Sequence, residues 1–158
     1  MIDSSAYHLV PVMAEDEEFL FHLFTQTFGA QLINSGLPEE LVAPLVEKQF
    51  QAKEVAYHND YPEALHSIIK LDVCAVGQIR VNRGPEEIRL VDISVLPEHQ
   101  GKGIGRKVIK ALLRSAEKER MPVTLTVERR SPARLLYEHL GFEVVKKNSV
   151  YYFMANFQ

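Results

Sequence analysis

The sequence has 158 residues, of which 46% are hydrophobic and 25% are charged, a composition that allows one domain with a full hydrophobic core and excludes a disordered or fibrous chain. Its formal net charge of −3 argues against a general nucleic-acid binder, because such proteins carry a strong basic excess. A single cysteine, Cys74, excludes an internal disulfide and fits a reducing compartment.

Two further exclusions concern membranes and targeting. No window approaches the roughly 18 uncharged apolar residues of a transmembrane helix, so no membrane partner is expected. Residues 1–5 lack a basic stretch followed by an apolar one, so no signal peptide is expected and the predicted location is cytoplasmic. Cys74 lies in the apolar run 71–76, which predicts a buried small residue rather than a nucleophile.

The N-terminal part predicts one strand and two helices. The strand covers residues 8–12, and Asp16 then opens a helix whose acidic first turn suits the helix dipole and for which Gly29 is a stop. After a turn rich in Asn, Ser, Gly and Pro, a second helix runs to about His58, and Pro44 marks either its start or a kink. Its apolar residues recur on nearly one face: Val42, Val46, Phe50 and Tyr57.

Three strands are predicted next. The first two cover 65–71 and 73–82, and they are separated by a tight polar point at Asp72 or by a break near Gly77. After an Arg-Gly-Pro-Glu turn, the third covers 87–96 and is rich in Ile, Leu and Val.

A glycine-rich loop at 97–105 leads into a strongly amphipathic helix that ends at Met121-Pro122. Apolar residues of this helix fall four apart: Ile104, Val108, Leu112 and Ala116. A strand at 123–127 follows, and Ser131-Pro132 then starts another helix, with Gly141 where a left-handed C-terminal cap belongs. The closing strands are 142–147 and 150–157.

The order of these elements, β-α-α-β-β-β-α-β-α-β-β, predicts a single α+β domain over residues 1–158, with a mixed central sheet of about seven strands flanked by four helices. The apolar C-terminal segment 151–157 can cover the core or pair with a second subunit, so a homodimer is one of the partners we consider.

The glycine loop has the properties of an anion site. It precedes a helix N-terminus, where the first amides have no internal acceptor and the macrodipole is positive. Gly101, Gly103 and Gly105 remove side chains that would keep a phosphate from those amides, and Lys102 and Arg106 add positive charge. The loop is neither a Walker loop nor a dinucleotide fingerprint, and a tight turn that needs small residues is the alternative.

The sequence around this loop closely resembles the acetyl-CoA motif of the GNAT superfamily of N-acyltransferases. That motif reads Gln/Arg-x-x-Gly-x-Gly/Ala after a strand, and Gln100, Gly103 and Gly105 match it within the segment 91–105. Residues 131–142 are similar to a second motif of the family, Asn-Pro-Ala-x-x-Leu-Tyr-x-x-x-Gly-Phe, with serine in place of the asparagine.

The resemblance covers the chain from about Leu71 to the C-terminus, while the two N-terminal helices match only in general plan. It implies a GNAT-like fold and an enzyme that moves an acetyl group from acetyl-CoA directly to an amine, with acetyl-CoA as co-substrate and no metal. Backbone groups of Ile93 and Val95 would pair with the pantetheine arm like an added strand, and the amides from Gly101 to Arg106 would hold the pyrophosphate. The residues thus implied in cofactor binding are Ile93, Val95, Gln100, Gly101, Lys102, Gly103, Ile104, Gly105, Arg106 and Ser131.

Two kinds of catalytic group are considered. The resemblance places Tyr137 beside the thioester sulfur, as the donor of a proton to the departing thiolate, although a core aromatic residue is the alternative. For deprotonation of the amine, Asp92 is the best-placed base because a charge within an apolar strand needs a reason. Glu128 and Glu87 are further candidates, and for each of the three a surface or structural carboxylate is the alternative. A chain of waters would also suffice.

Other polar residues give weaker signals. His58, His66 and His99 have no metal-ligand spacing, and His99 is expected at the surface. The segment 57–61 is polar and aromatic, and in the family this region borders the acceptor site, but an ordinary helix-ending loop explains it equally.

The acceptor is predicted to be a small-molecule amine or a peptide or protein amino group, with no nucleic-acid partner. Two other functions stay open. One is a non-catalytic acyl-CoA-binding sensor or regulatory module, against which the presence of Tyr137 argues. The other is a nucleotide-phosphate binder that uses the same loop, against which the missing Walker residues argue.

Overall fold

The computed structural model describes residues 7–157, and its strands form one seven-stranded sheet in the order β1-β2-β3-β4-β5-β7-β6. The strands are β1 (Tyr7–Pro11), β2 (Leu65–Leu71), β3 (Cys74–Arg83), β4 (Ile88–Val95), β5 (Val123–Glu128), β6 (Glu143–Lys147) and β7 (Tyr151–Asn156). Neighbouring strands are antiparallel except β4 and β5, which are parallel. The predicted α+β domain with a mixed sheet of seven strands is therefore confirmed. The expectation about a signal peptide in residues 1–5 lies outside the described residues.

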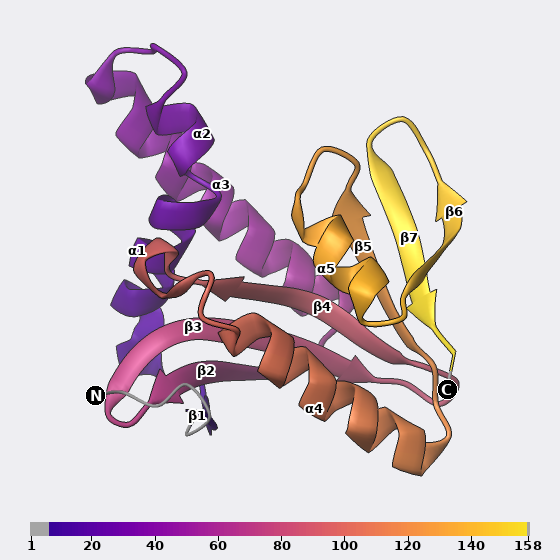
Figure 1. Cartoon of the computed structure of the whole chain (residues 1–158). Coiled ribbons are helices and arrows are strands. Elements are labelled where there is room, and N and C mark those ends of the chain that lie inside the picture. Colours follow the sequence, from indigo (N-terminus) through magenta and orange to yellow (C-terminus); the bar gives the residue numbers. More distant parts are fainter. Residues whose placement is uncertain (1–6, 158) are drawn as a thin grey trace.

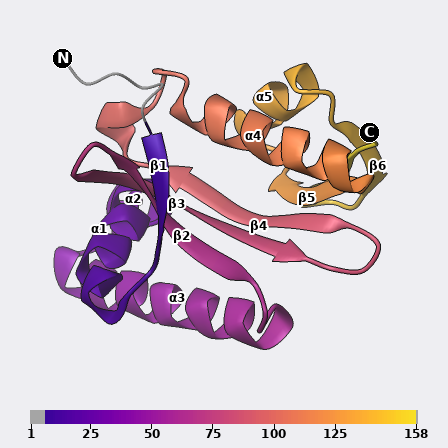
Figure 2. The ribbon, with the colours of Figure 1, turned by 90° about the horizontal axis from the view of Figure 1, so that it is seen from below.

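Helices cover both faces of this sheet (Figures 1 and 2). They are η2 (Ala14–Asp16), α1 (Glu17–Thr27), α2 (Ala30–Ile33), α3 (Glu39–Asp60), η3 (Pro97–His99), α4 (Ile104–Glu119) and α5 (Ala133–His139), where η denotes a 3-10 helix. Figure 2 shows α1 and α3 on one face and α4 on the other. Within residues 7–157, no helix is long and apolar enough to cross a bilayer.

Each face has its own hydrophobic core. Residues of α1 and α3 pack with Ile68, whereas residues of α4 and α5 pack with Ile69 and with apolar residues of β3, β4, β5 and β7. Ile68 and Ile69 are neighbours in β2 and are both fully buried, because successive side chains of a strand point to opposite faces of the sheet.

The N-terminal helices agree with the prediction in part. The helix α1 ends at Thr27 with Phe28 as its cap, so the stop predicted at Gly29 is confirmed, but Gly29 has a right-handed helical conformation (φ −71°, ψ −18°) from which the short helix α2 begins. Residues 7–157 therefore contain five α-helices where four were predicted. The next helix, α3, begins at Glu39, so Pro44 lies inside it and does not mark its start. Pro44 is the sixth residue of the helix, beyond its first turn, so its missing N–H removes the bond that the carbonyl of Glu40 would otherwise accept.

The structure of the hairpin between β2 and β3 tests two further predictions, the position of the break between the strands and the burial of Cys74. The break falls at Asp72, which has φ +55°, and Gly77 lies within β3. Cys74 follows the turn directly and is exposed, so the prediction of a buried cysteine is wrong. The apolar run was misleading because the turn residues Asp72 and Val73 place Cys74 at the rim of the sheet.

The C-terminal strand is interior to the sheet. β7 pairs with β5 on one edge and with β6 on the other, and its residues Met154 and Ala155 are buried. The C-terminal segment therefore covers the core, and its backbone is not available to pair with a second subunit.

Candidate functional site

The sheet opens between its two parallel strands. β4 and β5 pair only at Ile88 with Val123 and at Arg89 with Thr124, and beyond these residues the two strands diverge (Figure 1). The register of β4 against β3 shifts at the same place: Leu90 pairs with Val81, and Asp92 pairs with Arg80. This leaves Val91 as an extra residue, and such a bulge bends its strand and increases its twist. The bulge thus explains why β4 leaves β5 and why β5 does not pair with the edge of β4 from residue 90 to 95. We call this divergence of the two strands the opening.

The glycine loop lies at the C-terminal end of β4 and opens helix α4. Gly101 and Gly103 have φ of +78° and +81°, the left-handed conformation that other residues adopt only with strain. Gly103 is the N-terminal cap of α4, so the free amides of the first turn follow it directly. A Cβ added at either of these glycines or at Gly105 would meet no atom within 4 Å. The space above the first turn is therefore open to a ligand.

The other loop residues have distinct positions. The side chain of Gln100 donates from Nε2 to the backbone oxygen of Val95 at 2.8 Å, which ties the loop to the end of β4. Ile104 is 1% exposed and belongs to the core, so only its backbone amide can face a ligand. Lys102 and Arg106 are exposed beside the loop. His99, expected at the surface, is half-buried, and its Nδ1 has no hydrogen-bond partner among the described residues.

Tyr137 lies in α5, in the core that α4 and α5 share. Its ring meets that of Phe142 edge-on, with 5.8 Å between the centroids, and the residue is 8% exposed. Burial, together with the negative charge of Asp92, raises the pKa of Tyr137 to about 12. The phenol therefore keeps its proton at neutral pH, and no hydrogen bond to its hydroxyl is found within residues 7–157.

The ends of α5 are held by polar contacts. At its start, the hydroxyl of Ser131 accepts a hydrogen bond from the amide of Ala133 at 3.2 Å, which is the capping role that serine commonly has. At its end, Gly141 has φ +96°, as the predicted left-handed cap requires, and Asn156 of β7 donates to the carbonyl of Leu140 at 3.1 Å. These contacts fix the orientation in which α5 presents Tyr137.

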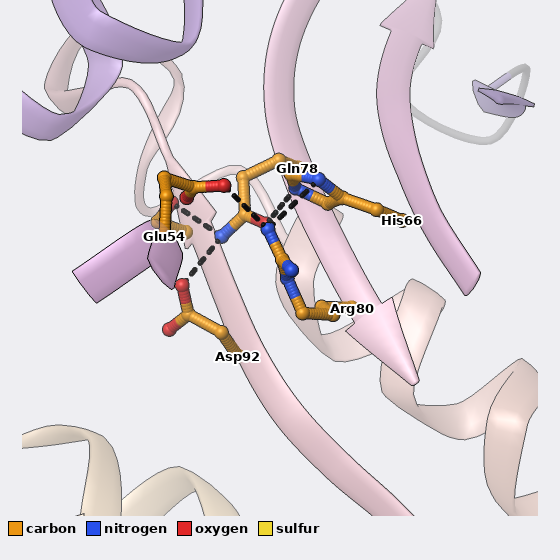
Figure 3. A network of polar contacts seen from close by, with 6 residues as sticks. Glu54, His66, Gln78, Arg80 and Asp92 are labelled. Atoms are coloured by element: carbon orange, nitrogen blue, oxygen red, sulfur yellow. Dashed lines mark hydrogen bonds and ion pairs between the residues drawn. The ribbon is translucent and has the colours of Figure 1, made fainter. Parts of the chain in front are cut away.

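A polar network crosses β2, β3 and β4 on the face covered by α3 (Figure 3). Arg80 Nη2 lies 2.8 Å from Glu54 Oε2 of α3 and 3.0 Å from His66 Nδ1. The other ring nitrogen of His66, Nε2, is 2.9 Å from Gln78 Oε1, and Gln78 Nε2 donates to Asp92 Oδ2 and to Ser94 Oγ, each at 3.0 Å. The amide and the guanidinium at its centre belong to residues that are only 5% and 7% exposed.

Asp92 is the point where this network meets the opening. Its carboxylate points to the face covered by α3, and its charge acts on the pKa of Tyr137, which belongs to the core on the other face. The two groups therefore lie within electrostatic reach of each other although they belong to different faces of the sheet. Asp92 also contributes to raising the pKa of Tyr57, although burial is the larger cause.

A lysine with aromatic neighbours lies on the same side. The ammonium of Lys53 is 3.6 Å from the ring centroid of Phe28, and the rings of Tyr57 and Phe24 lie farther away. Burial lowers the pKa of Lys53, and the carboxylates of Asp92, Glu54 and Glu128 oppose this shift. Glu128 is the last residue of β5 and is exposed.

The family model of the GNAT acetyltransferases matches residues 29–142. The chain belongs to this family. A search among curated proteins found no match. Among solved structures, the chain is similar to a PaiA N-acetyltransferase from Thermoplasma acidophilum in complex with coenzyme A, with a TM-score of 0.72, 16% identity, and coverage of 96% of this chain and 99% of that chain. It is also similar to an acetyltransferase from Thermus thermophilus, with a TM-score of 0.68, 20% identity, and coverage of 96% of each chain.

The family motifs did not indicate the polar network. Sequence reasoning selected Asp92 and noted Tyr57, but missed Lys53, Glu54, Gln78 and Arg80. Two signals were available. The buried face of α3 continues from Phe50 to Glu54 at a spacing of four residues, and β3 carries polar residues at alternate positions within a buried stretch. In both patterns, a polar side chain stands at a position that the spacing of the apolar residues in the helix or strand predicts to be buried. Buried polar groups are usually paired with a partner or have a function.

A largely basic groove runs along α4 and begins at Arg106, just after the glycine loop. Its volume is about 420 Å³, and its charged and imidazole lining comprises Arg106, Lys110, Arg114 and the acidic Glu117 of α4 and His139 at the end of α5. An anion held at the first turn of α4 would have this groove next to it. Within residues 7–157, no group of three or more His, Cys, Asp or Glu is placed to hold a metal.

Proposed function

We propose that this GNAT-family acetyltransferase transfers an acetyl group from acetyl-CoA directly to an amine, with Tyr137 as the general acid and Asp92 as the general base. The observation that supports the proposal is the divergence of β4 from β5, with the glycine loop at the end of β4 and with Asp92 and Tyr137 within electrostatic reach of each other. In this proposal the thioester would enter from the loop and the amine from the face covered by α3.

The cofactor would lie along β4 and α4. The pyrophosphate would accept hydrogen bonds from the amides between Gly101 and Arg106, where the helix dipole favours negative charge. The pantetheine arm would pair with the free edge of β4 around Ile93 and Val95, like an added strand. One lone pair of the Val95 carbonyl is already taken by Gln100, and the second can still accept. The basic groove along α4 would receive the remaining phosphate.

The reaction needs proton transfers at the amine and at the departing sulfur. Asp92, directly or through a water, takes the proton that the ammonium group loses before attack and passes it to solvent. The neutral amine then attacks the thioester carbonyl carbon, the C–N bond forms, and the C–S bond breaks as the sulfur leaves as a thiolate. The nitrogen loses its second proton to the same base as it becomes the amide nitrogen, while Tyr137 donates its proton to the thiolate and regains one from solvent. A thiol has an ordinary pKa of about 8.5, which is below that of the buried phenol. Desolvation in the same site also raises the pKa of the thiol, so the difference between the two pKa values becomes smaller.

Glu128 is the second candidate for the base. It is the last residue of β5, and its charge acts on Lys53. Because Glu128 is exposed and Asp92 is held by a buried amide, we assign the base to Asp92. Ser131 would contribute to the cofactor site only through the position of α5.

The acceptor we propose is a small-molecule or peptide amine, and we expect neither nucleic acid nor membrane as a partner. We also propose a cytoplasmic location, which the single cysteine favours. If the protein forms a homodimer, the contact uses a surface other than the backbone of β7, whose two edges are paired.

Cofactor binding is tested by thermal unfolding with acetyl-CoA. Saturation at 100 times Kd stabilises a protein by about 2.7 kcal/mol, so the thermal midpoint should rise clearly. Gly103→Glu puts bulk and negative charge into the space at the first turn of α4 and should abolish the rise, whereas Ser149→Glu adds the same charge in an exposed turn and should preserve it. A folded Gly103→Glu protein that binds acetyl-CoA normally would refute the loop assignment. Displacement by ATP at equal affinity would favour the nucleotide binder instead.

A further inference from the structure

The hydrogen bonds of the polar network can run in one direction only. A guanidinium has donors and no acceptor, so Arg80 must donate to both Glu54 Oε2 and His66 Nδ1. His66 Nδ1 is then an acceptor, and the proton of the neutral ring is on Nε2. This N–H donates to Gln78 Oε1.

The same direction continues to Asp92. Because the oxygen of Gln78 faces His66, its NH₂ group must face β4, where one hydrogen goes to Asp92 Oδ2 and the other to Ser94 Oγ. The oxygen of Asp92 that faces Gln78 must therefore accept. A flipped Gln78 would set its own oxygen against that carboxylate and its NH₂ group against the Nε2–H of His66. Arg80 thus determines, through two intermediates, how Asp92 is held.

The charge on His66 is fixed by its surroundings. Burial first, and then the positive charge of Arg80, lower the pKa of His66, while the bond to Gln78 and the charges of Glu54 and Asp92 oppose the shift. A protonated ring would also place an N–H of Nδ1 against the guanidinium. The neutral ring with its proton on Nε2 is the form that satisfies both neighbours.

We propose that Glu54 and His66 are positioning residues for catalysis: acting through Arg80 and Gln78, they hold Asp92 as a correctly oriented base where β4 leaves β5. This inference rests on the proposed function, since it assigns Asp92 to the acceptor amine. The simpler role, in which the network only fastens α3 to the sheet through Glu54 and Arg80, predicts a loss of stability but no specific link between His66 and Asp92.

The first test concerns the network itself and needs no turnover. Nitrogen-15 NMR of the imidazole rings at neutral pH should show His66 as the neutral ring protonated at Nε2, and the side-chain NH₂ of Gln78 should exchange slowly with solvent. In His66→Phe that exchange should become faster, while His8→Phe on the exposed part of β1 should leave it unchanged. A His66 ring protonated at Nδ1, or doubly protonated, would overturn the inference even if the enzyme is active.

The second test is a double-mutant cycle on amine turnover. The substitution His66→Phe removes the hydrogen bond from the charged Arg80 and the bond to Gln78. Because hydrogen bonds to charged groups contribute more than neutral ones, we expect turnover to fall roughly tenfold or more, with unchanged affinity for acetyl-CoA. His66→Gln keeps a donor toward Gln78 and should recover most of the loss. In the background of Asp92→Asn, His66→Phe should cause no further loss, because its effect passes through Asp92.

The outcomes separate the two hypotheses. Losses that multiply in the cycle, or a His66→Gln protein no better than His66→Phe, would overturn the positioning role. If no amine is turned over by the unaltered protein, the proposed function fails, and the NMR measurement still decides whether His66 and Gln78 are held in the inferred orientation.

Discussion

The substitution Tyr137→Phe separates the chemical role of this residue from its packing. It removes the hydroxyl and keeps the ring, whose edge-on contact with Phe142 is independent of the oxygen. Since no hydrogen bond to this buried hydroxyl is found within residues 7–157, its removal should leave the free energy of unfolding unchanged or slightly higher, because an unpaired buried hydroxyl is costly to desolvate. Affinity for acetyl-CoA should likewise be nearly unchanged, because the hydroxyl acts mainly in the transition state.

The effect on turnover should be much larger. General acid catalysis contributes roughly 10²–10⁴-fold, and a thiolate leaves with little help, so we expect a loss near the lower limit. A 100-fold loss corresponds to about 2.7 kcal/mol of transition-state stabilisation. Because the pKa of Tyr137 is about 12, the phenol stays protonated over the accessible range, and the rate should show no decline from its ionisation below about pH 10.

The assay is steady-state thiol release from acetyl-CoA, with a direct binding titration and thermal unfolding beside it. Tyr151→Phe is the matched control, since Tyr151 is 39% exposed on β7 and carries no assigned role. Full turnover in Tyr137→Phe would refute the general-acid role, and a collapse in thermal stability would show that Tyr137 serves the core.

Three further substitutions test other parts of the account. Asp92→Asn should lower turnover more at about pH 7 than at about pH 10, because the free amine becomes abundant near its own pKa of about 10.4; an equal loss at all pH values in rate measurements would indicate a structural role. Folding lowers the pKa of His66 below its ordinary value of 6.5, so the unfolded chain binds more protons than the folded protein as pH falls through that value. The free energy of unfolding, measured with urea, should therefore fall from about pH 7 to about pH 5. This pH dependence should weaken in His66→Gln, and an unchanged slope would contradict it. Gly141→Ala should lower the free energy of unfolding by about 1–2 kcal/mol, because φ is +96° and the new Cβ would lie 2.9 Å from Asn156 Nδ2; urea unfolding of a variant as stable as the parent would refute this strain.

Periodicity predicted the elements that have one clear face. The helix residues Ile104, Val108, Leu112 and Ala116 are all buried, as their spacing requires. The helix stop at Gly29 was predicted correctly, since α1 ends at Thr27, but the helix α2 that follows was missed because four residues are too few to show a helical period. Cys74 was predicted wrongly because its exposure follows from the position of a turn rather than from its apolar neighbours.

The candidate site also has one part that the sequence indicates and another that it does not. The glycine loop and Tyr137 lie in contiguous motifs, so the sequence alone indicates them. The opening depends on a bulge at Val91 that shifts the register between β3 and β4. Such a register depends on how two strands pair, so the sequence of either strand alone does not predict it. The link from Glu54 to Asp92 joins residues from α3, β2, β3 and β4, and only the folded sheet brings these segments together.

The measurement that tests the central proposal most directly is thiol release from acetyl-CoA with a panel of small-molecule and peptide amines, combined with mass analysis of the products. The account predicts amine-dependent release of one thiol for each acetylated amine, with no acetyl group left on the protein as an intermediate. Tight binding of acetyl-CoA without turnover of any amine in the panel would contradict the account and identify the protein as an acyl-CoA-binding module.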